Sequence, residues 1–471
     1  MKILLINPPY SFKEIGGVKQ NFRHVINIIP SLGLAYLAAV AEKNKHTVKI
    51  IDCTLGISDA EVVKITQDFK PRLVGITAAT PTFKNAVRVI SILRKVLPDS
   101  IFICGGAHPT ACPVESINSN VFDFVILGEG EETFLELISY IEGEKLDSAG
   151  DIRGIVFKKN GEFIITDLRP RINNLDSIPY PARHLLPALG RYQPTPASYR
   201  RLPIAVIMTS RGCPNRCVFC DRAVFGEKFR KRSVSNIMYE VKEVVYKYGA
   251  REIRFFDDTF TIDAGHVEDI CRKMRKLVPS VGWTCLTSVN SVNLDMLKMM
   301  KDAGCWQVLF GLESGDDYVL KHLGKGNTVK DNRRAVFWAK EAGLRVRADF
   351  LIGSPWETKE SLMRTVEFAK KLPLDFAHFN KFIPFPGTGI YNILTAQGYR
   401  FVFEKGGSIN DQTDAVYIPP SFSKAEYIKL LNQAYKKFYL RPTYLLRKLL
   451  SIKTSSEFIG HIKGLYSILS L

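Results

Sequence analysis

The chain has 471 residues, too many for one ordinary domain, so we expect two or three. Its hydrophobic fraction of 46% is typical of a globular protein and excludes a disordered chain. The formal charge of +18 would suit nucleic acid, anionic cofactors or an anionic membrane surface. The basic residues form no long block and no nucleic-acid module, so we expect a solvated basic surface and no nucleic-acid partner.

The first ten residues, MKILLINPPY, lack the pattern of a signal peptide. No stretch reaches the roughly 18 to 20 continuous apolar residues that a membrane span needs. Nine cysteines in a chain of this size do not make a disulfide scaffold. We therefore expect a cytoplasmic protein in which clustered cysteines bind metal.

Residues 1–145 alternate short apolar strands with helical patterns. Such alternation predicts parallel strands joined by right-handed crossovers, which is a doubly wound, Rossmann-like α/β sheet. Ligands of such sheets bind beyond the carboxyl ends of the strands. Glycines there allow close backbone approach to a ligand but also serve tight turns, so no single turn identifies a site. The predicted strands lie at 2–7, 47–52, 73–77, 101–106 and 123–131.

Residues 146–203 are expected to connect two domains. They begin with a predicted hairpin, GIVFKKNGEFIITD, that has Asn160 and Gly161 at its turn. A proline-rich stretch follows and predicts an extended, semi-rigid linker that contains the domain boundary.

A second series of strands and helices occupies residues 204–395. Six βα units predict an open, incomplete (β/α)6 barrel, because a complete barrel needs two further strands. Residues 396–471 are expected to form a helical C-terminal region. Chemistry in barrels belongs to the loops after the strands' carboxyl ends. The predicted strands lie at 204–208, 252–256, 283–288, 306–311, 345–352 and 376–383.

Three cysteines follow the first barrel strand, in RGCPNRCVFCD. Cys213, Cys217 and Cys220 are separated by three residues and then by two. A structural zinc site needs four closed ligands, and iron–sulfur cubanes normally take four thiolates. Three thiolates on a cubane would leave one iron open for a small molecule.

The CxxxCxxC spacing, with Phe219 just before its last cysteine, resembles the radical S-adenosylmethionine (SAM) superfamily. In that superfamily SAM supplies the fourth ligand of a 4Fe–4S cluster. The segments FFDDTF, GLESG, FLIGSPWET and PFPGT are similar to the branch with an N-terminal cobalamin-binding domain. The resemblance implies SAM contacts at Phe219, Glu313, Ser314 and Gly353. Glu313 could instead cap the helix that starts after its loop.

Three N-terminal segments, PSLGLAYLAAV, GGAHPT and VILGEGEETF, are similar to the cobalamin domain of the same branch. The DxHxxG motif of histidine-ligated cobalamin is absent, and a lone turn histidine is more often a hydrogen-bonding residue than a cobalt ligand. Cobalamin would then bind base-off, without a histidine ligand. The resemblance implies cobalamin contacts at Ser31, Gly33, Thr77, Gly105, Gly106, His108, Gly128 and Glu129.

Other polar positions leave alternatives open. Ser288 stands where relatives often have arginine, which leaves open how charge is paired there. Asp257 and Asp258 could form an acid–base pair, cap a turn or steer polar substrate atoms, and we expect a role in the site. The remaining six cysteines, such as Cys271, are expected to be inert packed thiols.

From about residue 420 the pattern is helical, with Tyr427, Leu430, Leu431 and Tyr435 on one face and many basic residues. This pattern fits a membrane-surface helix or a helix packed across the open side of the barrel, which we favour. Relatives with similar tails often act on isoprenoid-type lipids or tetrapyrroles, so an apolar substrate is expected.

Together these observations predict an enzyme that cleaves SAM reductively at a 4Fe–4S cluster and methylates an unactivated carbon with cobalamin. The alternative with the same cofactors is oxidative cyclisation or ring rearrangement. A non-catalytic cobalamin sensor is a third possibility, against which the complete cysteine triad and barrel loops count. A reducing protein such as a ferredoxin or flavodoxin is the expected partner.

Overall fold

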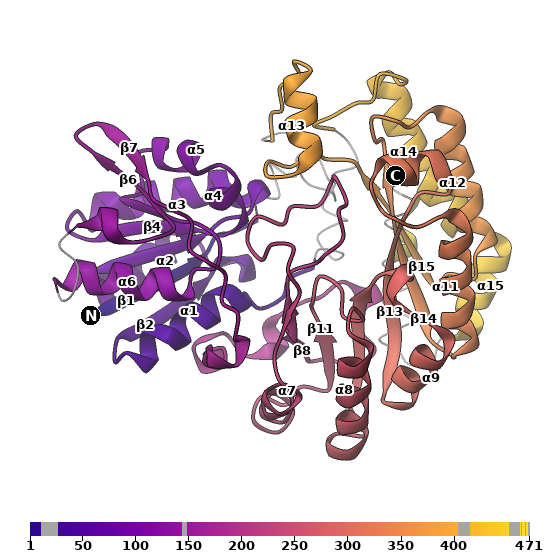
Figure 1. The fold of residues 1–471 in the computed structure, drawn as a ribbon, viewed down its shortest axis with the longest axis horizontal. Coiled ribbons are helices and arrows are strands. Elements are labelled where there is room, and N and C mark those ends of the chain that lie inside the picture. Colours follow the sequence, from indigo (N-terminus) through magenta and orange to yellow (C-terminus); the bar gives the residue numbers. More distant parts are fainter. Residues whose placement is uncertain are drawn as a thin grey trace.

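The structure is a computed structural model that describes residues 1–10, 27–143, 148–403 and 415–451, with 462, 464–466, 468 and 469. It contains two large sheets, one in each of two domains that lie side by side (Figure 1). No helix in the described ranges is long and apolar enough to cross a membrane.

The N-terminal domain is built on a sheet with the strand order β2-β1-β3-β4-β5-β6-β7. Its first five strands are parallel, which confirms the doubly wound prediction. Strands are added toward one edge from β1 to β2 and toward the other from β3 onward, and ligands of such sheets bind at this switch point between β1 and β3. The parallel strands are β1 (Lys2–Asn7), β2 (Thr47–Asp52), β3 (Leu73–Thr77), β4 (Ile101–Gly105) and β5 (Phe124–Ile126).

Helices cover both faces of this sheet. Ile3 and Leu5 of β1 pack in the core beneath α1 and α6, whereas Leu4 and Ile6 pack in the core beneath α2 and α3. Burial on both faces explains why the strand reads as a continuous apolar run. The helices are α1 (Leu32–Lys43), α2 (Asp59–Phe69), α3 (Phe83–Val96), α4 (Ala107–Ala111), α5 (Pro113–Asn118) and α6 (Glu131–Glu142).

The predicted hairpin is present as β6 (Ile155–Lys159) and β7 (Glu162–Ile165). Asn160 and Gly161 have φ angles of 54° and 84°, as a two-residue type I′ turn requires. β6 pairs antiparallel with β5. The hairpin therefore extends the first sheet, and the segment that joins the domains begins after it.

The second domain is the expected open barrel of six parallel strands, in the order β15-β14-β13-β12-β11-β8. A short ribbon of β9 (Ser210–Arg211) and β10 (Arg230–Lys231) follows β8. The barrel strands are β8 (Ile204–Ile207), β11 (Glu252–Phe255), β12 (Gly282–Thr287), β13 (Cys305–Glu313), β14 (Arg345–Ile352) and β15 (Phe376–Lys381). The helices around it are α7 (Val234–Lys242), α8 (Ala264–Leu277), α9 (Leu294–Asp302), α10 (Asp317–His322), α11 (Val329–Glu341), α12 (Lys359–Lys371) and α13 (Gly389–Ala396).

The open side of the barrel at β15 is covered by α14 (Lys424–Tyr439). The Tyr439 hydroxyl accepts from the Ala377 N–H at 3.1 Å and donates to the Ala377 carbonyl at 2.8 Å. The Tyr435 hydroxyl accepts from the Phe379 N–H at 3.2 Å. Tyrosines thus occupy backbone groups that a further strand would pair, which protects the edge. The favoured packing of this helix is confirmed.

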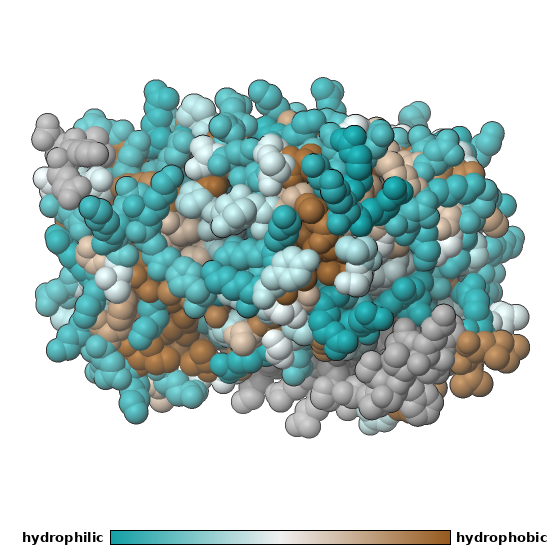
Figure 2. All heavy atoms as spheres, turned by 90° about the horizontal axis from the view of Figure 1, so that it is seen from below, coloured by the Kyte–Doolittle hydropathy of each residue, from teal (hydrophilic) through white to brown (hydrophobic). Residues whose placement is uncertain are grey.

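Two arginines at the following helix, α15 (Pro442–Ser451), bond to the barrel domain. Arg441, just before it, and Arg447 donate to the backbone carbonyls of Lys370 and Leu374. Their charges therefore serve tertiary contacts. Most of the tail after residue 451 lies outside the described residues. The outer side of α15 carries exposed leucines at 446, 449 and 450. Hydrophilic side chains cover most of the face of the molecule that Figure 2 shows.

Candidate active site

The cysteine loop leaves the barrel after β8 and is closed at its base by the β9–β10 ribbon. Arg211 pairs with Arg230 across this ribbon. Gly212 follows with a φ of 86°, and a Cβ there would collide with the Lys228 carbonyl oxygen. Only glycine therefore allows the chain to turn into the loop at this point.

Contacts from two helices hold the loop. The Val218 N–H donates to the carbonyl of Leu323, the residue after α10, at 3.1 Å. The Ile390 N–H of α13 donates to the Val218 carbonyl at 2.9 Å. Cys217 is buried, whereas Cys220 is exposed. The loop therefore presents thiols at its surface while its backbone is fixed.

The three sulfurs of the cysteine loop are not gathered around one point. Within the described part of the chain, only His108, Cys112 and Glu115 bring three ligand atoms within 4.8 Å of one another. The sulfurs of Cys213, Cys217 and Cys220 do not meet that limit. Ligands of one ion converge on it, whereas thiolates on a cubane each bind a different iron. The three thiols of the loop are spread apart, as ligands of separate irons would be.

Lys325 is a cation beside this loop that the sequence analysis missed. Its Nζ lies 2.9 Å from Oε1 of Glu313 and 5.8 Å from the centroid of the Phe219 ring. Burial raises the pKa of Cys217, and the charge of Lys325 lowers it. Lys325 therefore favours the thiolate form. It lies in the loop after α10, where no motif spacing marked it.

Glu313 ends β13 in a left-handed conformation, with a φ of 61°. A Cβ on Gly311 would lie 2.9 Å from the Nζ of Lys325, so this glycine makes room for the ion pair. The helix after the loop is capped by Asp316, which accepts from the Val319 N–H at 3.1 Å. The alternative role of Glu313 as the cap of that helix is therefore wrong.

Ser314, Phe219 and Gly353 lie around the same strand ends. The Ser314 hydroxyl is buried and lies 3.0 Å from the Thr365 hydroxyl of α12, so it faces the helix layer. Phe219 packs against a small apolar core. Gly353 has a φ of 89°, and a Cβ there would collide with the Tyr427 hydroxyl of α14. The C-terminal helix thus supports the loop after β14.

The two aspartates after β11 lie in different environments. Asp257 is buried and accepts from the Thr209 N–H at 2.7 Å and the Ser210 hydroxyl at 2.9 Å. Burial raises its pKa to about 6 although these hydrogen bonds favour the carboxylate. Asp257 therefore anchors the entry to the cysteine loop. Asp258 is exposed, and its charge raises the pKa of Cys220, so it lies beside the loop.

Ser288, where we noted a missing arginine, caps the turn after β12. Its hydroxyl accepts from the Asn290 N–H at 3.3 Å. The Asn290 amide in turn donates to the Gly326 carbonyl at 2.9 Å. This contact joins the turn to the loop that contains Lys325. Lys325 therefore places a positive charge near Ser288, on a different segment from the arginine of relatives.

The residues expected to contact cobalamin lie at the carboxyl edge of the first sheet. Thr77 ends β3 and Gly105 ends β4. Gly106 has a φ of 111°, and a Cβ there would lie 2.8 Å from the Ala78 carbonyl oxygen. A Cβ on Gly33 or Gly128 would meet open space. Ser31 precedes α1 at the same edge.

Glu129 lies at this edge, but its carboxylate is bonded within the protein. Oε1 accepts from Arg211 at 2.9 Å and Oε2 from Arg230 at 2.7 Å. Oε2 also accepts from the Ile172 N–H at 2.9 Å. Glu131 accepts from the other arm of Arg211. This buried network fixes the loop after β5 against the ribbon that carries the cysteines.

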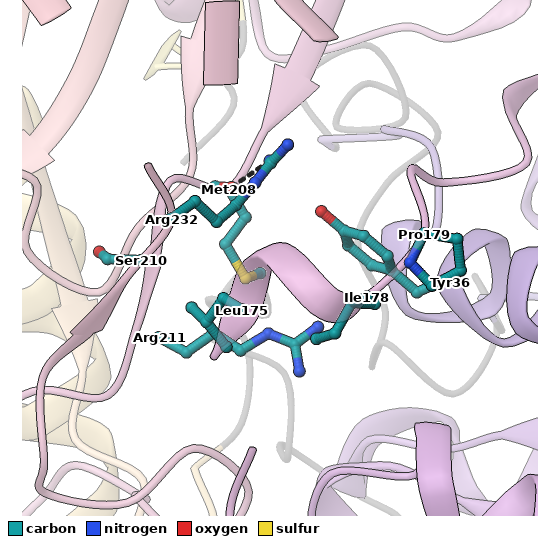
Figure 3. A pocket seen from close by; sticks show the side chains of 8 residues that line it. All are labelled: Tyr36, Leu175, Ile178, Pro179, Met208, Ser210, Arg211 and Arg232. Carbon is teal, nitrogen blue, oxygen red and sulfur yellow. Dashed lines mark hydrogen bonds between the residues drawn. The ribbon is translucent and has the colours of Figure 1, made fainter. Parts of the chain in front are cut away.

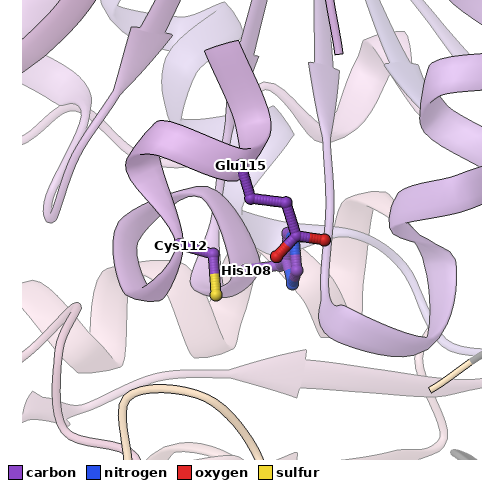
Figure 4. A group of neighbouring side chains, drawn as sticks. All are labelled: His108, Cys112 and Glu115. Carbon is purple, nitrogen blue, oxygen red and sulfur yellow. The ribbon is translucent and has the colours of Figure 1, made fainter. Parts of the chain in front are cut away.

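His108 is buried beneath Phe83, with their ring centroids 4.1 Å apart, and Figure 4 shows it beside Cys112 and Glu115. Its Nδ1 lies 3.3 Å from the Thr80 hydroxyl and its Nε2 lies 3.8 Å from Oε1 of Glu115. Burial lowers the pKa of His108 to about 4, so the ring is neutral. These contacts agree with a packed histidine.

The two strand-end edges meet at the junction of the domains. A Cβ on Gly387, after β15, would lie 2.9 Å from both the Ala111 Cβ of α4 and Oδ1 of Asp221. A pocket lies between α1, the connector and the β9–β10 ribbon, which directly precedes the cysteine loop (Figure 3). Tyr36 and Arg211 face each other across it, with the guanidinium 5.4 Å from the ring.

The chain thus combines a doubly wound sheet with an open barrel, and the three-cysteine loop lies where the two domains meet. The radical SAM superfamily profile matches residues 207–369, and the B12 binding domain profile matches residues 19–138. An uncharacterized methyltransferase of Pyrococcus horikoshii is 36% identical over 95% of this chain and 94% of its own. The chain belongs to the cobalamin-dependent radical SAM enzymes.

More distant relatives catalyse different reactions. Cytidylyl-2-hydroxyethylphosphonate methyltransferase of Streptomyces wedmorensis is 27% identical, over 86% of this chain and 85% of its own. Anaerobic magnesium-protoporphyrin IX monomethyl ester cyclase of Rubrivivax gelatinosus is 26% identical, over 94% of this chain and 78% of its own.

Two solved structures share the fold. OxsB, with aqua-cobalamin and SAM bound, superimposes with a TM-score of 0.74 over 99% of this chain and 70% of its own, at 18% identity. TsrM of Kitasatospora setae, with cobalamin and a 4Fe–4S cluster bound, superimposes with a TM-score of 0.71. The match covers 94% of this chain and 89% of its own, also at 18% identity.

Family membership establishes the cofactors as a 4Fe–4S cluster, SAM and cobalamin. It also establishes the protein as an enzyme that needs a small-molecule substrate and a reductant. When bound, these cofactors supply the radical chemistry, and the protein supplies binding and orientation. The sensor hypothesis is therefore not retained.

Proposed function

We propose that the enzyme methylates an unactivated carbon of a small molecule. The observation that supports this function is the junction at which the cobalamin-side helix α4 meets the cysteine loop, through Ala111, Gly387 and Asp221. A methyl carrier and a radical source must act on the same substrate carbon, so their sites must face one another. The 36% identical relative is also a methyltransferase by name.

In this proposal the thiolates of Cys213, Cys217 and Cys220 bind the cluster. SAM would lie against Phe219. Glu313, its ion-pair partner Lys325 and the loop that contains Gly353 would also border SAM. The buried Asp257 positions the loop through Thr209 and Ser210. Asp258, which is exposed beside the loop, is our candidate for proton transfer or substrate steering.

On the N-terminal side, the proposed cobalamin surface consists of the sheet edge around Thr77, Gly105 and Gly106, with the open positions Gly33 and Gly128. Ser31 borders it. Glu129 supports this surface without contacting cobalamin, because its carboxylate forms ion pairs with Arg211 and Arg230. His108 is packed under Phe83 and leaves cobalt without a histidine ligand.

The fate of SAM tests this function. Homolysis of SAM yields 5′-deoxyadenosine, whereas methyl donation yields S-adenosylhomocysteine. A methyltransferase of this class forms both, so the reconstituted enzyme, given its substrate and a reducing partner such as a ferredoxin or flavodoxin, should release them in comparable amounts. A deuterated SAM methyl group should appear in the product.

Oxidative cyclisation is the second candidate, because the cyclase of Rubrivivax gelatinosus aligns over 94% of this chain. A cyclase needs only the radical. Steady turnover with 5′-deoxyadenosine but without S-adenosylhomocysteine would therefore overturn methyl transfer in favour of cyclisation.

A further inference from the structure

The inner wall of the barrel carries charged side chains that the cofactor sites do not use. Successive residues of a strand point to opposite faces. Ile253, Val346, Ala348 and Ala377 pack outward in the main core, so their neighbours point into the barrel. These inward residues are Arg254 of β11, Arg347 and Asp349 of β14 and His378 of β15, which we call the lumen cluster.

Three members of the lumen cluster, Arg347, Asp349 and His378, contact one another. Nη2 of Arg347 lies 3.0 Å from Nδ1 of His378, and Nη1 donates to the Ser198 hydroxyl at 3.1 Å. Oδ1 of Asp349 lies 3.4 Å from Nδ1 of His378 and 3.7 Å from Nε of Arg347.

The charges of the lumen cluster do not balance. Two guanidinium groups face a single carboxylate. Burial and the neighbouring Arg347 lower the pKa of Arg254 to about 10, so Arg254 stays charged near neutral pH. Burial and the two arginines lower the pKa of His378 well below its usual value, which makes it neutral. Burial also raises the pKa of Asp349, which weakens the only negative charge.

Several polar atoms of the cluster lack partners. Arg254 is 7% exposed, and its Nη1 has no hydrogen-bond partner among the described residues. Nε of Arg347 and Oδ1 of Asp349 also make no hydrogen bond in the described structure, although they lie 3.7 Å apart as an ion pair. A buried cation without a partner is costly, so proteins rarely keep one without use.

Part of the lumen cluster is accessible to solvent. The side chains of Asp349 and His378 are 26% and 27% exposed, whereas the outward residues next to them are buried. Lys325, beside the cysteine loop, lowers the pKa of Asp349 by its charge, so the lumen lies within electrostatic reach of the proposed SAM site.

From this arrangement we propose that the lumen cluster binds an anionic group of the substrate, a carboxylate or a phosphate-type group, between Arg254 and Arg347. A planar guanidinium pairs well with either group. The inference rests on the proposed function and adds to it, because it names a chemical feature of the substrate. An otherwise apolar substrate would then be held by its charged end, with its body toward the cofactors.

Binding of simple anions to the reconstituted full-length enzyme tests this site without turnover. We would follow thermal unfolding by circular dichroism while inorganic phosphate or acetate replaces chloride at constant ionic strength, with acetamide as the neutral probe. The wild type should show a saturable rise in melting temperature with phosphate, acetate or both. Arg254→Gln and Arg347→Gln should weaken anion binding and so raise the half-saturating anion concentration about tenfold or more.

Arg272→Gln is the matched control, because the Arg272 side chain is 68% exposed on α8, and it should respond as the wild type does. In chloride alone Arg254→Gln should melt no lower than the wild type, since it removes a buried cation from a cluster with excess positive charge. Absence of a saturable anion response in the wild type would overturn the proposal. So would equal responses in the wild type and both lumen variants. A missing S-adenosylhomocysteine product would contradict methyl transfer and leave this anion response unchanged.

Discussion

Oε1 of Glu129, at the carboxyl edge of the first sheet, accepts a 2.9 Å hydrogen bond from Nη1 of Arg211, two residues before Cys213. Both side chains are almost completely buried. The pair, with Arg230 and Glu131, therefore connects the proposed cobalamin edge to the cysteine loop through charged groups that water does not screen.

Arg211→Met should destabilise the protein strongly, because it leaves two buried carboxylates short of a partner. Removal of one partner from a buried ion pair costs about 3–5 kcal/mol in free energy of unfolding. Chemical denaturation followed by circular dichroism would measure the loss. Arg88→Met is the control, because Arg88 and Asp59 form an exposed pair worth at most about 1 kcal/mol. Equal costs for the two variants would contradict a special role for the buried network.

The cysteine loop should determine the iron content. After anaerobic reconstitution the wild type should hold about four irons and four sulfides per chain, the stoichiometry of a thiolate-bound cubane. Alanine at Cys213, Cys217 or Cys220 should remove the cluster absorbance and abolish SAM cleavage. Cys271→Ala changes a buried thiol in the barrel core and should keep its iron. Full iron content in any variant of the triad would refute the assignment.

His108→Ala should leave the absorption spectrum of bound cobalamin in its base-off form. His108 is neutral and packed against Phe83, so we expect that it does not bind cobalt. Spectra of the full-length protein reconstituted with cobalamin would show the outcome. A spectral shift toward an unligated form in the variant would mean that His108 reaches the cobalt after all.

Glu357→Gln should change how stability depends on pH. Glu357 is buried, its Oε1 lacks a partner in the described structure, and burial raises its pKa to about 8. Between its ordinary pKa and pH 8 the folded state holds a proton that the unfolded state has lost, so the free energy of unfolding falls as pH rises.

Glutamine keeps the acceptor for the Gly353 N–H and cannot ionise. Relative to the wild type, the variant should therefore gain stability from pH 5 to pH 8, by up to about 1.4 kcal/mol per pH unit. Melting temperatures of both proteins across this range would show it. Parallel pH profiles would mean that Glu357 stays ionised in the folded protein.

Local sequence patterns were enough for most of the fold. Both faces of β1 are buried, and its apolar run shows this directly. The Asn160–Gly161 turn needs two positive φ angles, which that pair adopts readily. The pattern could not show that the hairpin joins the first sheet, because strand pairing is set by contacts between distant residues.

The site divides in the same way. Cys213, Cys217 and Cys220 lie within one loop, so their spacing alone indicated a cluster. Lys325 escaped notice because it reaches Glu313 from another loop, and no periodicity links the two.

The sequence by itself determined the two domains, the strands and the cysteine loop, since each depends on residues close together in the chain. The tertiary structure alone decided which charges meet. Glu129, which the family pattern assigned to cobalamin, is bonded to Arg211 and Arg230 from the other domain. Arg254 and Arg347 come from different strands to face one carboxylate. Electrostatic energy depends on distance in space, and only folding sets those distances.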